Sequence, residues 1–145
     1  MVPLNYGAPK AAAALADQAR QAAGNRPTAA AVLAAAVAAR VYALNDQPEQ
    51  ARSALSDADS PMDRLPQGQR SDTWLAHSKQ KHHVHLSHAY TTLADTAHAF
   101  ESQQRALDLS APTSTMTRTL LHIGNATCPT TTATAKKRAA VRSPP

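Results

Sequence analysis

The stretch that decides the fold is HHVHLSHAYTTLADTAHAFESQQRALDLSAP, residues 82–112. Small and large apolar residues recur in it at fixed spacings, and the residues that carry the pattern are Leu86, Tyr90, Ala94, Ala99 and Ala106. Small side chains let two helices approach closely, while a leucine and a tyrosine fill the space between them. The pattern therefore predicts two antiparallel helices with a turn just before Asp95 or Thr96.

These spacings resemble those of a tetratricopeptide (TPR) repeat, and Pro112 lies one residue past the position expected for its closing proline. The resemblance implies a helical scaffold for protein binding and no catalytic chemistry. A second copy lies upstream, because Tyr42, Ala51 and Ala58 have the spacings, nine and seven, that separate Tyr90, Ala99 and Ala106. The offset is 48 residues, longer than the usual length of about 34, and the register of the first copy could slip by one residue around Asp46.

Proline, glycine and capping residues mark helix starts and stops, and together with this pattern they predict six helices. We expect them over residues 9–23, from Pro27 to residue 44, from Pro48 to residue 58, from Thr73 to residue 93, from Asp95 or Thr96 to residue 109, and from a cap at Thr113 or Ser114 to residue 127. A loop is expected over 59–71. The apolar stripes predicted to face the core are Leu33, Val37, Val41 and Leu44; Ala51, Ala54, Leu55 and Ala58; and Leu75, His82, Leu86, Ala89 or Tyr90, and Leu93.

No segment alternates with period two, so we predict no sheet. The fold class is all-α, with a TPR-like helical domain over residues 1–127. Residues 128–145 have no apolar stripe and end in two prolines, so they are expected to form a disordered basic tail.

The charge of the chain is concentrated in that tail. The full chain of 145 residues has a net charge of +5. Four of its basic residues lie in the last ten positions: Lys136, Lys137, Arg138 and Arg142. Cys128 is the single cysteine, so no intrachain disulfide can form. The uninterrupted apolar run over 29–39 is too short for a membrane span, which needs about 20 residues, and the N-terminus lacks the features of a signal peptide. We expect a cytoplasmic protein with no membrane contact.

The histidines at positions 82, 83, 85 and 88 crowd one helix, with no Asp or Glu among them. Two histidines three apart could reach one ion, but we interpret the cluster as a solvated helix face with one interior residue, His82. The chain has no GxSxG motif and no glycine-rich phosphate loop. We therefore expect no metal site, no cofactor and no enzymatic activity.

The run from Ser60 to Cys128 resembles the C-terminal region of actinobacterial transcriptional regulators that pair an XRE-type helix-turn-helix with a TPR-like helical region. The resemblance covers residues 10–128 and implies a protein-interaction or sensor module. The chain begins inside the helical region and leaves the pattern at Cys128, so we expect a truncated relative. The alternatives are a DNA-binding regulator that acts through residues 15–32 or the basic tail, and a truncated product without function.

The expected partner is a protein or a peptide, since nucleic-acid binding would require a separate helix-turn-helix. The last helix presents Met116, Leu120 and Ile123 on one face, and no following helix is predicted to cover them. We expect this face to bind an amphipathic helix or to mediate self-association. Trp74 is expected to pack against the neighbouring repeat.

Overall fold

The computed structural model describes residues 7–71, 73, 76–111, 114–124 and 126, and all regular structure in this part of the chain is helical. Its elements are α2 (Pro9–Ala23), α3 (Ala29–Leu44), α4 (Pro48–Met62), the 3-10 helix η1 (Gln67–Gln69), α5 (Lys79–Thr92) and α6 (Thr96–Asp108); residues 115–124 are helical as well. The prediction of an all-α fold is confirmed. The predicted tail, Trp74, Leu75 and Pro112 lie outside the described residues.

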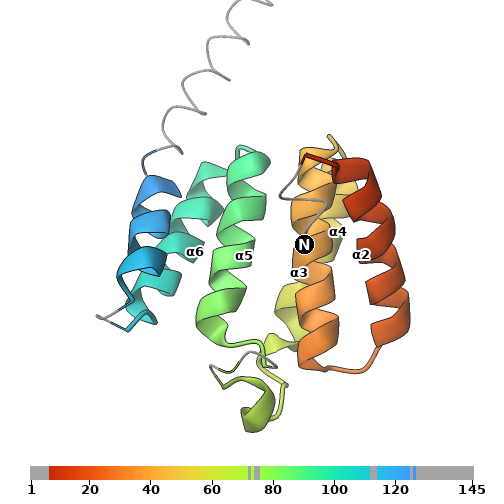
Figure 1. Ribbon diagram of the computed structural model, residues 1–145, viewed down its shortest axis with the longest axis horizontal. Coiled ribbons are helices and arrows are strands. Elements are labelled where there is room, and N and C mark those ends of the chain that lie inside the picture. Colours follow the sequence, from red (N-terminus) through yellow and green to blue (C-terminus); the bar gives the residue numbers. More distant parts are fainter. Residues whose placement is uncertain (1–6, 72, 74–75, 112–113, 125, 127–145) are drawn as a thin grey trace, which may run out of the picture.

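The helices stand side by side, and consecutive helices run antiparallel (Figure 1). Helix α3 packs against α2, α4 and α5, and α5 packs against α6. The pairs α3–α4 and α5–α6 are the two copies of the repeat that the sequence predicts. Helix α2 lies on the outer side of the first pair, and residues 115–124 lie at the other end of the row (Figure 1).

The turns inside the two pairs have the same hydrogen bonds, 48 residues apart. The amide of Gln47 donates to the carbonyl of Tyr42 at 2.9 Å, and Asp95 donates to Tyr90 at 2.9 Å. Between these partners, Asp46 and Ala94 both adopt left-handed backbone, with φ of 56° and 58°. The two copies are therefore in register at this turn, without the one-residue slip that the sequence left open.

Helix α2 ends at Gly24, whose φ of 65° is readily adopted by glycine. Helix α3 begins later than predicted, because Thr28 and not Pro27 determines its start. The Thr28 side chain accepts a hydrogen bond from the amide of Ala31, as an N-cap does. Proline 27 lies before the cap and outside the helix.

Two further boundaries differ from the prediction. Helix α4 runs through Pro61 to Met62, where a loop was expected from residue 59, because Met62 and Leu65 are buried against Val32 and this burial holds the last turn in place. Helix α5 begins at Lys79 and not at Thr73, since Ser78 caps it by accepting from the amide of Lys81.

The segment between the two pairs folds back over the first pair. In η1, the side-chain oxygen of Gln69 accepts a hydrogen bond from the amide of Ala29 at 2.8 Å, so it caps the start of α3. The carbonyl of the same residue accepts from the amide of His77 at 3.0 Å. These two bonds place His77 at the junction of the pairs, where it is 2% exposed.

The core of α3 consists mainly of alanines, and the predicted leucine stripe is wrong. Leu33 and Leu44 are 41% and 51% exposed, while Val41 alone of the stripe is fully buried. The buried residues of the helix are Ala29, Val32, Ala35, Ala36, Ala38, Ala39, Val41, Tyr42 and Ala43. A helix surrounded by α2, α4 and α5 has little room for large side chains, so small residues face its neighbours.

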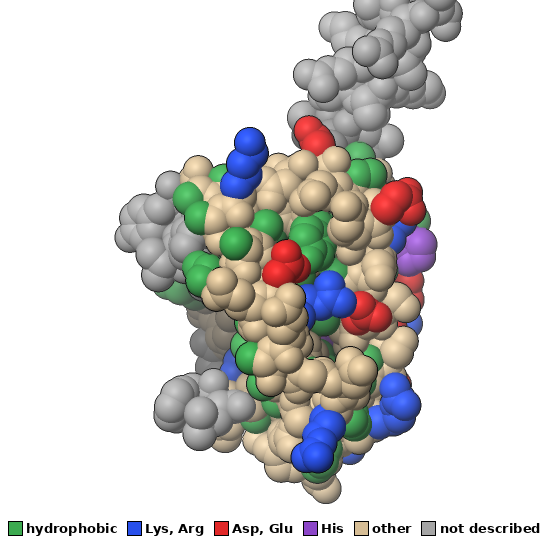
Figure 2. Space-filling model, turned by 90° about the vertical axis from the view of Figure 1, so that its right-hand side faces the viewer, with side chains coloured by type: hydrophobic (Ala, Val, Ile, Leu, Met, Phe, Trp, Pro, Cys, Tyr) green, Lys and Arg blue, Asp and Glu red, His purple; other side chains and the backbone are tan. Residues whose placement is uncertain are grey.

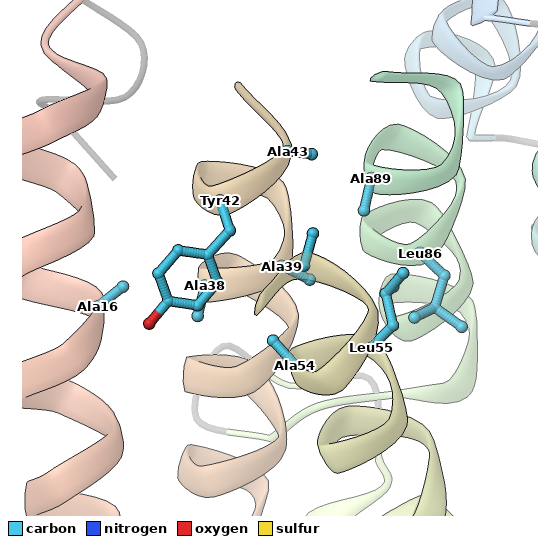
Figure 3. Close-up of a cluster of buried hydrophobic side chains, with 10 residues drawn as sticks. Ala16, Ala38, Ala39, Tyr42, Ala43, Ala54, Leu55, Leu86 and Ala89 are labelled. Carbon is cyan, nitrogen blue, oxygen red and sulfur yellow. The ribbon is translucent and has the colours of Figure 1, made fainter. Parts of the chain in front are cut away.

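Larger side chains fill the space between the alanine contacts (Figure 3). The ring of Tyr42 extends from α3 toward Ala16 of α2, and Leu55 of α4 lies beside Leu86 of α5. The predicted stripe on α4 is confirmed, because Ala51, Ala54, Leu55 and Ala58 are all buried.

Candidate functional site

The residues of the repeat signature are buried or half-buried, with one exception. Ala51, Ala58, Ala99 and Ala106 have no exposed surface, Leu86 is 5% exposed and Tyr42 is 8% exposed. Tyr90 is half-buried and packs at the edge of the main apolar cluster. The exception is Ala94, which is exposed and lies in the turn between α5 and α6, outside any helix contact.

The two tyrosines of the signature make comparable contacts with the preceding helix. The Tyr42 hydroxyl donates a hydrogen bond to the carboxylate of Asp17 on α2. Tyr90 lines a small hollow together with Asp59 of α4, and its ring stacks on His98 with centroids 5.1 Å apart. Burial raises the pKa of both hydroxyls. Each tyrosine therefore joins its own pair to the helix before it.

The predicted interaction face is exposed. Met116, Leu120 and Ile123 are 78%, 58% and 56% exposed, while Leu121 on another side of the same turns is 4% exposed. Leu121 packs with Ala106 and Leu107 of α6. The segment is thus attached to α6 through one side, and three large apolar side chains point away from the described residues that it packs against.

The surface of α2 lacks such a concentration of apolar side chains. In Figure 2, which shows the side of the molecule that lies on the right in Figure 1, basic and acidic side chains alternate with small apolar patches. A hollow of about 650 Å³ lies between α2 and α4, over Ala31 and Ala35 of α3. Arg20 and Asp57 form an ion pair of 2.5 Å between these two outer helices.

The histidines lie close together, and the prediction of a solvated face with one interior residue is correct only in part. His82 is 1% exposed, as predicted, but His77 is 2% exposed and was not predicted to belong to the cluster. His83 and His85 are half-buried, and only the side chain of His88 in this group is exposed. Nothing in the sequence places His77 there, because its position depends on the fold of the segment before α5.

Contacts join His77, His82 and His85 in a row between Asp59 and Arg40. Asp59 Oδ1 lies 3.1 Å from His82 Nε2, and His82 Nδ1 lies 3.4 Å from His77 Nε2. The ring of His77 lies 5.9 Å from the ring of His85, centroid to centroid. At the far end, Arg40 Nη1 of α3 lies 3.4 Å from His85 Nδ1. This row of contacts therefore joins α4, α5 and α3.

The order of these groups does not match a catalytic dyad. In a general-base dyad the carboxylate is inside and orients an imidazole that faces the substrate. Here the carboxylate of Asp59 is 67% exposed and the imidazole of His82 is buried, so no basic nitrogen of His82 faces a substrate. Within the described ranges, no three His, Cys, Asp or Glu side chains are arranged as metal ligands.

Residues 15–32, considered above as a helix-turn-helix, form the end of α2, the start of α3 and the five-residue connection between them. The second of these helices would have to enter the major groove of DNA. It is instead the most enclosed helix of the fold, and α2, α4 and α5 cover it. This segment therefore offers no exposed recognition helix.

No protein-family model, curated protein or solved structure matches this chain. Within the described part of the chain, no helix combines the length and the apolar character needed to cross a membrane.

Proposed function

We propose that this chain is a non-catalytic helical-repeat module of the TPR type that binds another protein. The proposal is supported by the two helix pairs with equivalent turns and by buried alanines at equivalent positions of both pairs. Its biological setting is proposed from the sequence resemblance alone: an interaction or sensor region related to bacterial transcriptional regulators, in the cytoplasm.

The observation that carries the proposal is the exposure of Met116, Leu120 and Ile123 on one face of the last described helical segment. Full burial of one such side chain contributes about 1.5–3 kcal/mol. Three of them on adjacent turns match the spacing by which an amphipathic helix docks. We propose that this face receives an amphipathic helix, and the same helix of a second copy is the occupant that can be tested directly.

Sedimentation velocity of the full chain over a range of concentrations tests this docking face. We expect reversible self-association, and we expect Leu120→Lys to abolish it because a charge would then be buried at the contact. The matched control is His122→Lys, which adds the same charge at an exposed position on another side of the helix. A monomer at high concentration that Leu120→Lys leaves unchanged would refute the docking face.

A further inference from the structure

The junction between the two helix pairs contains histidines beside its apolar contact. Leu86 and Ala89 are the buried residues that α5 contributes to the main apolar cluster. Beside them, polar contacts join the same elements: Asp59 to His82 from α4 to α5, and Arg40 to His85 from α3 to α5. Two of the contacts that attach the second pair therefore involve titratable rings.

Hydrogen-bond donors and acceptors determine how many protons the cluster can hold. A carboxylate only accepts, so His82 Nε2 must carry hydrogen to bond Asp59. The bond between His82 Nδ1 and His77 Nε2 needs one proton and one lone pair. The two rings together can therefore take up one additional proton by a change of tautomer. A second additional proton would place two N–H groups against each other at 3.4 Å.

The same reasoning applies to the contact between Arg40 and His85, at the other end of the row of histidines. A guanidinium always donates, so Arg40 Nη1 requires a lone pair on His85 Nδ1. Protonation of this nitrogen removes the hydrogen bond and places two cations in contact. The closed junction therefore needs a neutral His85 and at least one neutral ring in the His77–His82 pair.

The charges that face the cluster offer little compensation for added protons. Arg40 from α3, Arg105 from α6, and Lys79, Lys81 and His88 from α5 itself oppose protonation of one or another of the rings. Asp59 from α4 is the carboxylate that faces the cluster, and it is already bonded to His82. The environment is thus predominantly cationic.

We propose that the histidine cluster is an acid-sensitive joint, at which α5 and α6 separate from α3 and α4 when the pH falls below neutral. The device responds to proton concentration and is independent of the proposed docking face.

The pKa values of the buried rings have the direction that this joint requires. Burial, with His82 and Lys81 adding to it, lowers the pKa of His77 to about 4. Burial, with Arg40 as the next cause, lowers the pKa of His85 to about 3. The unfolded chain, where a histidine titrates near pH 6.5, then binds more protons than the folded chain. The stability from these rings is complete above pH 6.5 and is lost as the pH falls below it.

Denaturant unfolding of the full chain at pH 7 and at pH 5 tests the joint, with wild type compared with the double variant His77→Gln, His85→Gln. Glutamine keeps a hydrogen-bonding group and does not titrate in this range. We expect the unfolding equilibrium constant of the wild type to rise at least about tenfold more than that of the variant. The control His122→Gln removes an exposed histidine and should behave as the wild type does.

Hydrogen exchange at the two pH values locates the effect. Amides of α5 should lose protection at pH 5 before amides of α2 and α3 do. Equal pH dependence of the wild type and the double variant would overturn the proposal, as would a simultaneous loss of protection in all helices. If the double variant does not fold, NMR titration of the wild-type rings decides the question. Free titration of His77 and His85 between pH 7 and pH 5, with α5 still protected, would contradict the joint.

Discussion

At the scale of single residues, Ala94 is the signature position whose structural role differs most from its sequence pattern. It has a φ of 58°, a conformation that costs a residue with a Cβ about 1–2 kcal/mol. Its equivalent in the first pair, Asp46, adopts the same conformation, which Asp tolerates better than Ala does. The spacing that selects Ala94 in the sequence therefore corresponds to a turn requirement and not to helix packing.

We expect Ala94→Gly to raise the free energy of unfolding by about 0.5–1 kcal/mol, since glycine adopts positive φ without a steric penalty. Urea unfolding of the wild type and of Ala94→Gly measures the difference in the free energy of unfolding. Ala99→Gly is the matched control, because it makes the same substitution inside α6 at a residue with no exposed surface, where it should destabilise. A loss of stability in Ala94→Gly would count against the turn geometry.

The alanines of α3 allow a second prediction at this scale. Ala39 has no exposed surface and lies in the cluster shared with α5, so Ala39→Leu should cost about 1–3 kcal/mol through overpacking. Leu44→Ala, by contrast, should change stability by less than about 1 kcal/mol, since Leu44 is 51% exposed. Thermal or denaturant unfolding measures both changes. A larger loss of stability in Leu44→Ala than in Ala39→Leu would indicate that the predicted leucine stripe does face the core.

At the scale of the helix, boundaries depend on which of several capable residues is used as the cap. The segment before α5 offers Ser71 and Ser78. In the structure Ser78 accepts from the amide of Lys81, and the Ser71 hydroxyl donates to the carbonyl of Gly68. The cap that is used therefore lies seven residues after the first serine that could have capped the helix.

Ser78→Ala should lower the free energy of unfolding by about 1 kcal/mol, the usual effect of removing an N-cap. Ser71→Ala should have a smaller effect, since its hydroxyl is exposed and caps no helix. The comparison of both variants by circular dichroism during denaturation tests the start of α5. Equal losses would indicate that the helix begins nearer the prediction.

How much the sequence predicts also differs between elements. The sequence predicts some helix boundaries correctly: the end of α2 at Gly24, the start of α4 at Pro48 and the start of α6 at Asp95. Each of these residues acts through its own backbone or its nearest turn. The exposure of Leu33 and the burial of His77 could not be predicted in this way. Both depend on contacts between segments far apart in the chain, which determine how much volume is available around a residue.

At the scale of the whole molecule, the carboxylates give acid sensitivity in a second, lower range of pH. The hydrogen bond from His82 lowers the pKa of Asp59, and the hydrogen bond from Lys79 lowers the pKa of Asp63. The stability from these groups is present above about pH 4 and is lost as the pH falls through their folded-state values.

We therefore expect two overlapping steps when stability is measured against pH, one that begins near pH 6.5 and continues to about pH 3, and one that begins below about pH 4. The double variant His77→Gln, His85→Gln should keep the lower step and lose most of the upper one. The variant Asp63→Asn should weaken the lower step alone. A single step that both variants shift equally would contradict this separation of the two groups.

The enclosure of α3 also determines what to expect with nucleic acid. We expect no sequence-specific duplex binding through residues 15–32, because the second helix of that segment is covered on several sides. Any binding by the full chain should be weak and should fall steeply with salt. Fluorescence anisotropy with and without residues 129–145 measures this. Tight binding at physiological salt that survives their removal would overturn the expectation.

The alanine surface of α3 also limits how this protein can evolve. A single-nucleotide change in an alanine codon produces Gly, Val, Ser, Thr, Pro, Asp or Glu. At Ala38 and Ala39, which have no exposed surface, most of these add atoms or charge where no space is free, and proline breaks the helix. Serine and glycine remain as the small replacements. The central helix should therefore vary little between descendants of this gene, while exposed positions such as Leu33 and Leu44 vary freely.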